Sequence, residues 1–153
     1  MATRIQSLRT NGRPRRAGRA PTVLPVPAPT QQLEAYGGVA VVELARRIYE
    51  LRRSRDASFG ADLFSEPAWD LLLHLFVAGA EGRTVSVSSA CDGAAAPATT
   101  ALRKLRQLEE GGWIVRAGDP ADARRSYVRL SPKATNKMRS LLRQACPKLG
   151  GNG

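Results

Sequence analysis

The chain has 153 residues, of which 42% are hydrophobic, and a formal net charge of +11 at pH 7. This length suits about one domain and is too short for a large barrel enzyme. The sequence lacks the run of about 18 apolar residues that a membrane-spanning helix needs. The charge indicates an anionic partner, with nucleic acid ahead of a membrane surface.

Few residues in the sequence favour catalysis or metal binding. Cys91 and Cys146 lie far apart and His74 is the only histidine, so neither a disulfide framework nor a four-ligand zinc site is expected. Phosphate-loop, dinucleotide-binding and HExxH motifs are missing from the sequence. We therefore expect no enzymatic activity, no cofactor and no metal, and a reducing cytoplasmic location close to DNA.

The first 30 residues carry six arginines, five prolines and no acidic residue, which accounts for +6 of the net charge. Such a segment buries too little apolar surface to offset its ordering entropy, so residues 1–30 are expected to form a disordered basic arm. The arm has three interpretations: non-specific contact with DNA phosphates, a solvated tail or untranslated sequence, and a targeting peptide.

Two helices are predicted in the first half of the remaining chain. Apolar residues recur at spacings of three and four over residues 31–57, with Gly37-Gly38 as a point of interruption or a start. Five arginines of this segment are expected on a solvated face, with a phosphate-facing flank as the alternative: Arg46, Arg47, Arg52, Arg53 and Arg55. Ser65 is expected to cap a second helix that begins at Pro67 and is buried on more than one side.

The second half of the chain alternates short helices and strands. Residues 84–87 favour a strand, and residues 88–96 a short helix. Residues 97–110 form a helix with Ala101, Leu102, Leu105 and Leu108 on its inner face, which Gly111-Gly112 ends. Residues 113–116 and 127–130 are predicted strands joined by a polar turn, with 117–126 forming the wing. Ser131-Pro132 caps a last helix to about residue 145, with Met138, Leu141 and Leu142 on its apolar side.

This order predicts a mainly α fold with a small β-hairpin, a helix-turn-helix followed by a wing. The segment Asp122-Ala123-Arg124-Arg125-Ser126-Tyr127-Val128-Arg129-Leu130-Ser131 matches D-x-R-x-x-x-V-x-L-[ST], the wing signature of the multiple-antibiotic-resistance regulator (MarR) family. Leu108-Glu109-Glu110-Gly111-Gly112-Trp113 resembles the family's segment after the recognition helix. Over residues 31–145 the chain resembles that family of winged helix-turn-helix regulators.

The resemblance implies a homodimeric transcription regulator, most simply a repressor, that binds pseudo-palindromic duplex DNA. It implies a winged-helix domain over residues 31–149, with helices 31–57 and 131–146 forming the dimer. It also implies release by a small aromatic effector or by oxidation. In this chain the last helix is short for such a dimer.

The expected DNA-binding residues lie on the recognition helix (97–110) and the wing (117–126). Arg103 suits a bidentate contact with guanine, and Gln107 suits adenine. Lys104 and Arg106 are expected on phosphates. In the wing, the resemblance implies that Arg124 enters the minor groove, and Asp122 is expected to hold it by an ion pair. The full predicted set is Ala98, Thr99, Thr100, Arg103, Lys104, Arg106, Gln107, Arg124 and Arg125, with Asp122 stabilising the wing.

Several alternatives stay open in the sequence. Cys91 is either a redox sensor or, more commonly for such a position, a buried structural cysteine. Tyr49, Phe64 and Trp69 are either part of an aromatic ligand pocket or plain core. The alternative functions are a non-specific nucleoid-type DNA binder and a winged-helix adaptor for another protein.

Overall fold

The computed structural model describes residues 29–149, and the predicted basic arm falls outside this range except for Pro29 and Thr30. Helices, strands and one 3-10 turn follow in this order: α1 (Pro29–Ala35), α2 (Val39–Phe59), η1 (Ala61–Phe64), α3 (Pro67–Ala80), β1 (Val85–Ser86), α4 (Val87–Gly93), α5 (Ala98–Glu110), β2 (Ile114–Gly118), β3 (Ser126–Leu130) and α6 (Pro132–Leu149). No helix in residues 29–149 is long and apolar enough to cross a membrane.

The first predicted helix is two helices. Gly37 and Gly38 have φ angles of +99° and +85°, a conformation that glycine adopts without steric cost and that interrupts a right-handed helix. Gly37-Gly38 thus interrupts the segment 31–57, as its glycines indicated. α1 is a short separate helix, and α2 starts at Val39.

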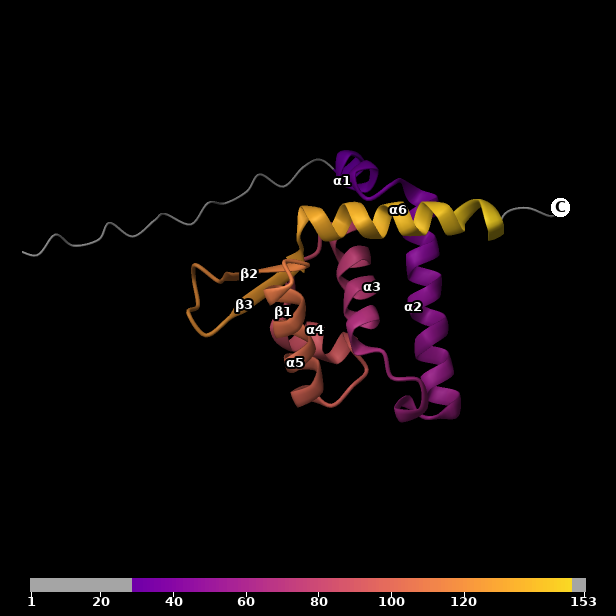
Figure 1. Cartoon of the computed structure of the whole chain (residues 1–153). Coiled ribbons are helices and arrows are strands. Elements are labelled where there is room, and N and C mark those ends of the chain that lie inside the picture. Colours follow the sequence, from indigo (N-terminus) through magenta and orange to yellow (C-terminus); the bar gives the residue numbers. More distant parts are fainter. Residues whose placement is uncertain (1–28, 150–153) are drawn as a thin grey trace, which may run out of the picture.

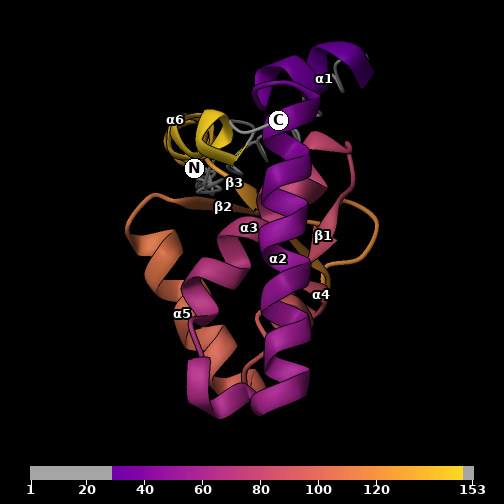
Figure 2. The same cartoon turned by 90° about the vertical axis from the view of Figure 1, so that its right-hand side faces the viewer.

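Helix α3 forms the centre of the core. Leu71, Leu73 and Phe76 are fully buried, which confirms the prediction that this helix is covered on more than one side. Figure 1 shows α3 between α2 on one side and α4 and α5 on the other, and Figure 2 gives the perpendicular view. The predicted Ser65 cap is wrong: Glu66 occupies the N-cap position, and no side chain caps the helix.

Five arginines of α2 were predicted on a solvated or phosphate-facing flank, and the structure shows them paired with carboxylates. Arg52 is buried, and its Nε lies 2.6 Å from Asp70 Oδ1, while Arg53 Nη2 lies 2.9 Å from Asp70 Oδ2. Arg52 also pairs with Glu66 at 2.5 Å. The others pair as Arg46 with Glu81, Arg47 with Glu43, and Arg55 with Asp56. The pairs of Arg52 and Arg53 with Asp70 join α2 to α3, and Arg46 reaches Glu81 at the end of α3, whereas Arg47 and Arg55 pair within α2. The predicted solvated face holds for Arg47, whose side chain is 75% exposed, and is wrong for the buried Arg52.

A small antiparallel sheet lies at one edge of the helices, with strand order β1-β3-β2. Val85 pairs with Val128, and the β2–β3 register runs from Ile114↔Leu130 to Gly118↔Ser126. The strand predicted at residues 84–87 is shorter because Val87 already belongs to α4. Ser86 caps that helix, with its Oγ accepting a hydrogen bond from Ser89 N at 3.1 Å.

Helices α4 and α5 with the β2–β3 hairpin make an arrangement that is compatible with a winged helix. The short helix predicted to reach Ala96 ends at Gly93, and Ala95 in the turn has a φ angle of +44°. Pro97 then takes the N-cap position of α5. The described chain is thus mostly helical with a small antiparallel sheet, in agreement with the predicted fold class.

Helix α6 is longer than predicted and extends to Leu149, across the ends of α2 and α3 (Figure 1). Ser131 caps it as predicted, since Ser131 Oγ accepts from Ala134 N at 3.1 Å. Met138 and Leu142 are buried, but Leu141 is 50% exposed, which corrects its predicted place on the apolar side. Arg139 Nη1 donates to Ala35 O at 3.0 Å and so ties α6 to α1.

Candidate nucleic-acid interface

Helix α5 has one buried face and one exposed face. Ala101, Leu105 and Leu108 are buried in the core, whereas Leu102, predicted to join them, is 39% exposed. The exposed residues of the helix include five of the predicted DNA-binding residues: Ala98, Thr99, Arg103, Arg106 and Gln107. Thr100 and Lys104 are partly buried on its flank. The structure thus places the predicted helix residues on one continuous, mostly polar surface.

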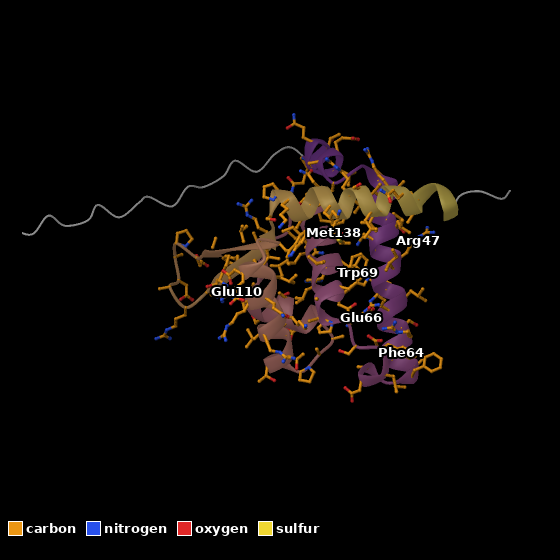
Figure 3. The ribbon with its side chains drawn as sticks, viewed as in Figure 1. Arg47, Phe64, Glu66, Trp69, Glu110 and Met138 are labelled. Atoms are coloured by element: carbon orange, nitrogen blue, oxygen red, sulfur yellow. The ribbon has the colours of Figure 1, made fainter. Side chains whose placement is uncertain are left out.

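The two arginines on this surface are not used by the fold. Within residues 29–149, the guanidinium groups of Arg103 and Arg106 form no ion pair and no side-chain hydrogen bond. Both line a shallow hollow together with Lys104, Gln107 and Glu110 (Glu110 is labelled in Figure 3). Lys104 Nζ donates to Gln107 Oε1 at 3.1 Å, which positions the amide. Glu109 instead turns toward the hairpin and lies 3.4 Å from Arg116 Nε on β2.

The tip of the wing is held by two aspartates rather than by one. Asp122 Oδ1 accepts a hydrogen bond from the backbone N of Arg124 at 3.0 Å, and its Oδ2 lies 3.7 Å from Arg125 Nε. The predicted pair between the side chains of Asp122 and Arg124 is therefore wrong. The exposed Arg124 guanidinium has no partner within residues 29–149, so it is available to a ligand.

Asp119, which sequence analysis missed, is the second aspartate. It accepts hydrogen bonds from Ala121 N at 2.8 Å and from Tyr127 Oη at 2.9 Å. The backbone bond from Ala121, followed by the Tyr127 hydroxyl, lowers the pKa of Asp119 below its usual range. The Asp-Pro pair at the start of the turn was the available signal, because aspartate side chains commonly accept from the backbone two residues on.

A concave surface connects the wing to the start of α4. Its volume is about 470 Å³, and it is lined by Ser86, Val87, Ser88, Arg124, Arg125, Ser126 and Tyr127. Hydroxyl donors and guanidinium groups are side chains that bind phosphate oxygens. Ser86 and Ser88 were not predicted, because only the folded chain brings β1 and the start of α4 beside the wing.

Cys91 has the environment of a structural cysteine. It is buried at the edge of the core in α4, and burial, with the charge of Asp92 as a further cause, raises the pKa of its thiol. Reactive thiols usually have a lowered pKa, because the thiolate is the nucleophile. This environment favours the structural interpretation over redox sensing.

The three aromatic residues considered for a ligand pocket lie on three different elements, α2, η1 and α3. Phe64 projects outward near the end of α2, with its ring 6.1 Å from that of Phe59, while Trp69 lies on α3 against the core (Figure 3). Tyr49 donates from Oη to Gly93 O at 3.0 Å, and its ring lies 5.7 Å from that of His74. The positions of these residues favour packing roles.

His74 lies on α3 beside the end of α4. Its Nε2 is buried without a hydrogen-bond partner within residues 29–149. Burial, followed by the charge of Arg83, lowers the pKa of this imidazole. Neutral histidine is therefore the form that the folded chain accommodates.

Comparisons with known proteins find a similar solved structure and no matching family model. No family model matches the sequence, and no curated protein matches it. Among solved structures, the chain is similar to the crystal structure of apo (heme-free) PefR, with 15% sequence identity and a TM-score of 0.39. The match covers 69% of this chain and 93% of that chain. This likeness is too slight to assign a family.

Proposed function

We propose that the chain is a sequence-specific DNA-binding regulator of transcription, most simply a repressor, that inserts α5 into the major groove of duplex DNA. The observation that carries the proposal is the exposed face of α5, where Arg103 and Arg106 have no partner within residues 29–149. Guanidinium groups that the fold leaves unpaired are suited to bind anionic or acceptor-rich ligands, and duplex DNA offers both.

The roles of the side chains follow from their place on α5. Arg103 lies at the middle of the exposed face and donates to the O6 and N7 acceptors of a guanine. Gln107, oriented by Lys104, lies one turn further on and is suited to an adenine. Thr99, Thr100 and Arg106 then fix the helix on sugar and phosphate groups. Ala98, at the exposed start of the helix, lets the backbone approach closely.

The wing makes the second contact in this proposal. Arg124, whose guanidinium is free of protein partners in residues 29–149, enters the minor groove, where a narrow groove concentrates negative potential. Asp119 and Asp122 hold the tip from which it projects, and Arg125 binds the adjacent phosphate. Ser86 and Ser88 extend this phosphate contact along the concave surface described above.

A homodimer completes the proposal, since two copies of α5 are needed to bind a pseudo-palindromic site. The outer side of α2 supports it. A groove of about 540 Å³ lies between α2 and the end of α6, with apolar lining from Leu44, Ile48, Leu51 and Cys146. Exposed apolar residues on the two helices continue this surface, so a second copy would remove them from water. Gel filtration with light scattering tests the dimer.

The test of function is selection of bound fragments from random duplex DNA at physiological salt, with the native chain, Arg103→Ala and Arg83→Ala. Arg83 is the matched control, because its loss removes the same charge from an exposed position after α3, outside α5, the wing and the proposed dimer groove. We expect a defined, dyad-symmetric sequence for the native chain and the control, and a preference relaxed at one base pair per half-site for Arg103→Ala.

The alternative functions give different results in the same experiment. Binding that falls steeply with salt and enriches no sequence would identify a non-specific nucleoid-type binder. The absence of binding would favour an adaptor for another protein. An unchanged selected sequence with Arg103→Ala would refute the assigned role of α5.

A further inference from the structure

The exposed face of α5 contains an apolar side chain among its polar ones. Leu102 is 39% exposed, and it is a leucine in the middle of the helix rather than at a frayed end. The core does not need it: Ala101, Leu105 and Leu108 already cover the inner face of the helix and are buried. Its side chain is therefore free to contact a ligand bound at this face.

The neighbours of Leu102 on the helix surface are residues of the proposed DNA contact. Residues three and four apart share a face of a helix, so Leu102 lies between Thr99 on one side and Arg106 on the other. Arg103 is the next residue along the chain and belongs to the same exposed surface. A ligand that contacts Arg103 and Thr99 must therefore come close to the leucine side chain.

The major groove offers an apolar group that fits this position. Among the base edges exposed there, thymine alone carries a methyl group, and apolar side chains in the groove contact it. Deoxyribose also has apolar carbon atoms, but they are the same at every nucleotide and carry no sequence information. Only the thymine methyl group combines apolar contact with the choice of a base.

We infer that Leu102 is a specificity-determining residue, and that it packs against the 5-methyl group of a thymine next to the guanine bound by Arg103. The inference rests on the proposed function and sharpens it, because it assigns a second base of each half-site. It predicts that the bound sequence has adjacent G and T positions that depend on two neighbouring residues of one helix.

The test uses the native chain and the sequence that it selects from random DNA. One thymine of that sequence at a time is replaced by deoxyuridine, which removes the methyl group and keeps the base-pairing edge. We expect one position per half-site at which this replacement weakens binding by about fourfold, as expected when burial of one methyl-sized group is lost. That position should be adjacent to the base pair at which Arg103→Ala relaxes the preference.

Leu102→Ala then closes a double-mutant cycle. In this variant the deoxyuridine replacement should have no further effect, since the partner of the methyl group is already gone. The matched control is Leu63→Ala, which truncates a 71% exposed leucine in η1 and should retain the fourfold effect. Thermal unfolding of both variants checks that they are folded.

Three results would overturn the inference in distinguishable ways. Specific binding with no position sensitive to deoxyuridine, or with equal sensitivity in Leu102→Ala, removes the role of Leu102 and leaves the proposed function intact. A sensitive position remote from the one assigned to Arg103 contradicts the adjacency. A native chain that selects no sequence refutes the proposed function and this inference together.

Discussion

The arginines of α2 and the arginines of α5 differ in whether the fold gives them a carboxylate partner. Arg52 and Arg53 form ion pairs with the carboxylate of Asp70, which is 1% exposed. These two positive charges are therefore neutralised within the fold. Arg103 and Arg106 extend from α5 with no carboxylate to bind within residues 29–149. Net charge therefore says little about function until each charge is assigned a partner, and Arg103, Arg106 and Arg124, which have no ion pair within residues 29–149, lie on the proposed contact surface.

The largest effect is expected at Asp70. Asp70→Ala leaves two guanidinium groups beside the α2–α3 contact without their carboxylate, and removal of one member of a buried pair costs about 3–5 kcal/mol. Urea unfolding measures this free energy, and the fraction that remains folded should keep the native DNA sequence preference. A loss below about 1 kcal/mol, the range of exposed pairs, would show that the pair is solvated.

Arg103→Ala should show the reverse pattern. Its folding free energy should stay within about 0.5 kcal/mol of the native value, as is usual for surface substitutions. Discrimination of the contacted base pair should fall by roughly 1–3 kcal/mol. Competition binding and urea unfolding of the same sample measure both. Destabilisation comparable to that of Asp70→Ala would contradict the contrast between the two helices.

His74 should make the stability of the fold, but not its DNA sequence preference, depend on pH. Because its pKa in the folded chain is lowered, the unfolded chain takes up the proton more readily. Stability should be full above the ordinary histidine pKa of about 6.5 and should decrease as the pH falls through that value. Unfolding midpoints at several pH values test this, and His74→Gln should flatten the dependence. His74 is not part of the exposed face of α5, so sequence preference should stay constant over this range.

The smallest effect on folding is expected at the wing. Asp119→Ala removes the acceptor of Ala121 N and of the Tyr127 hydroxyl at an exposed tip. The midpoint of unfolding should barely change, while DNA affinity falls roughly two- to tenfold because a loosened segment must be ordered on binding. Since the pKa of Asp119 is lowered, this ordering is present at neutral pH and is lost as the pH falls through that lowered value. Amide exchange at Ala121 measures it.

Elements with a local signal could be predicted from the sequence. The ends of α5 follow from Pro97 and Gly111, and the hairpin follows from two apolar segments around a polar turn. The fate of α2's arginines could not be predicted, because Asp70 is 18 residues from Arg52 and on another helix. Nothing in the local pattern distinguishes a guanidinium that pairs across helices from one that faces solvent.

Leu102 shows a different limit. Apolar periodicity shows which side of a helix is buried, but it does not show where the buried face ends. Leu102 lies at the edge of the buried face of α5. Whether this edge is covered depends on the neighbouring helices, which leave Leu102 39% exposed. The incorrect prediction is informative, since it identifies the apolar residue that the core does not use.

Ser131 connects three elements by its own hydrogen bonds. Its Oγ donates to Gly112 O at 2.7 Å and accepts from Ala134 N, and its backbone N donates to Trp113 O at 2.9 Å. Ser131 thus connects the end of α5, the start of β2 and the first turn of α6. These three segments cannot rotate independently of one another. In the proposed dimer, where α6 faces the second copy, this joint would fix the distance between the two copies of α5. The spacing of half-sites along the DNA would then be a property of a serine that touches no base.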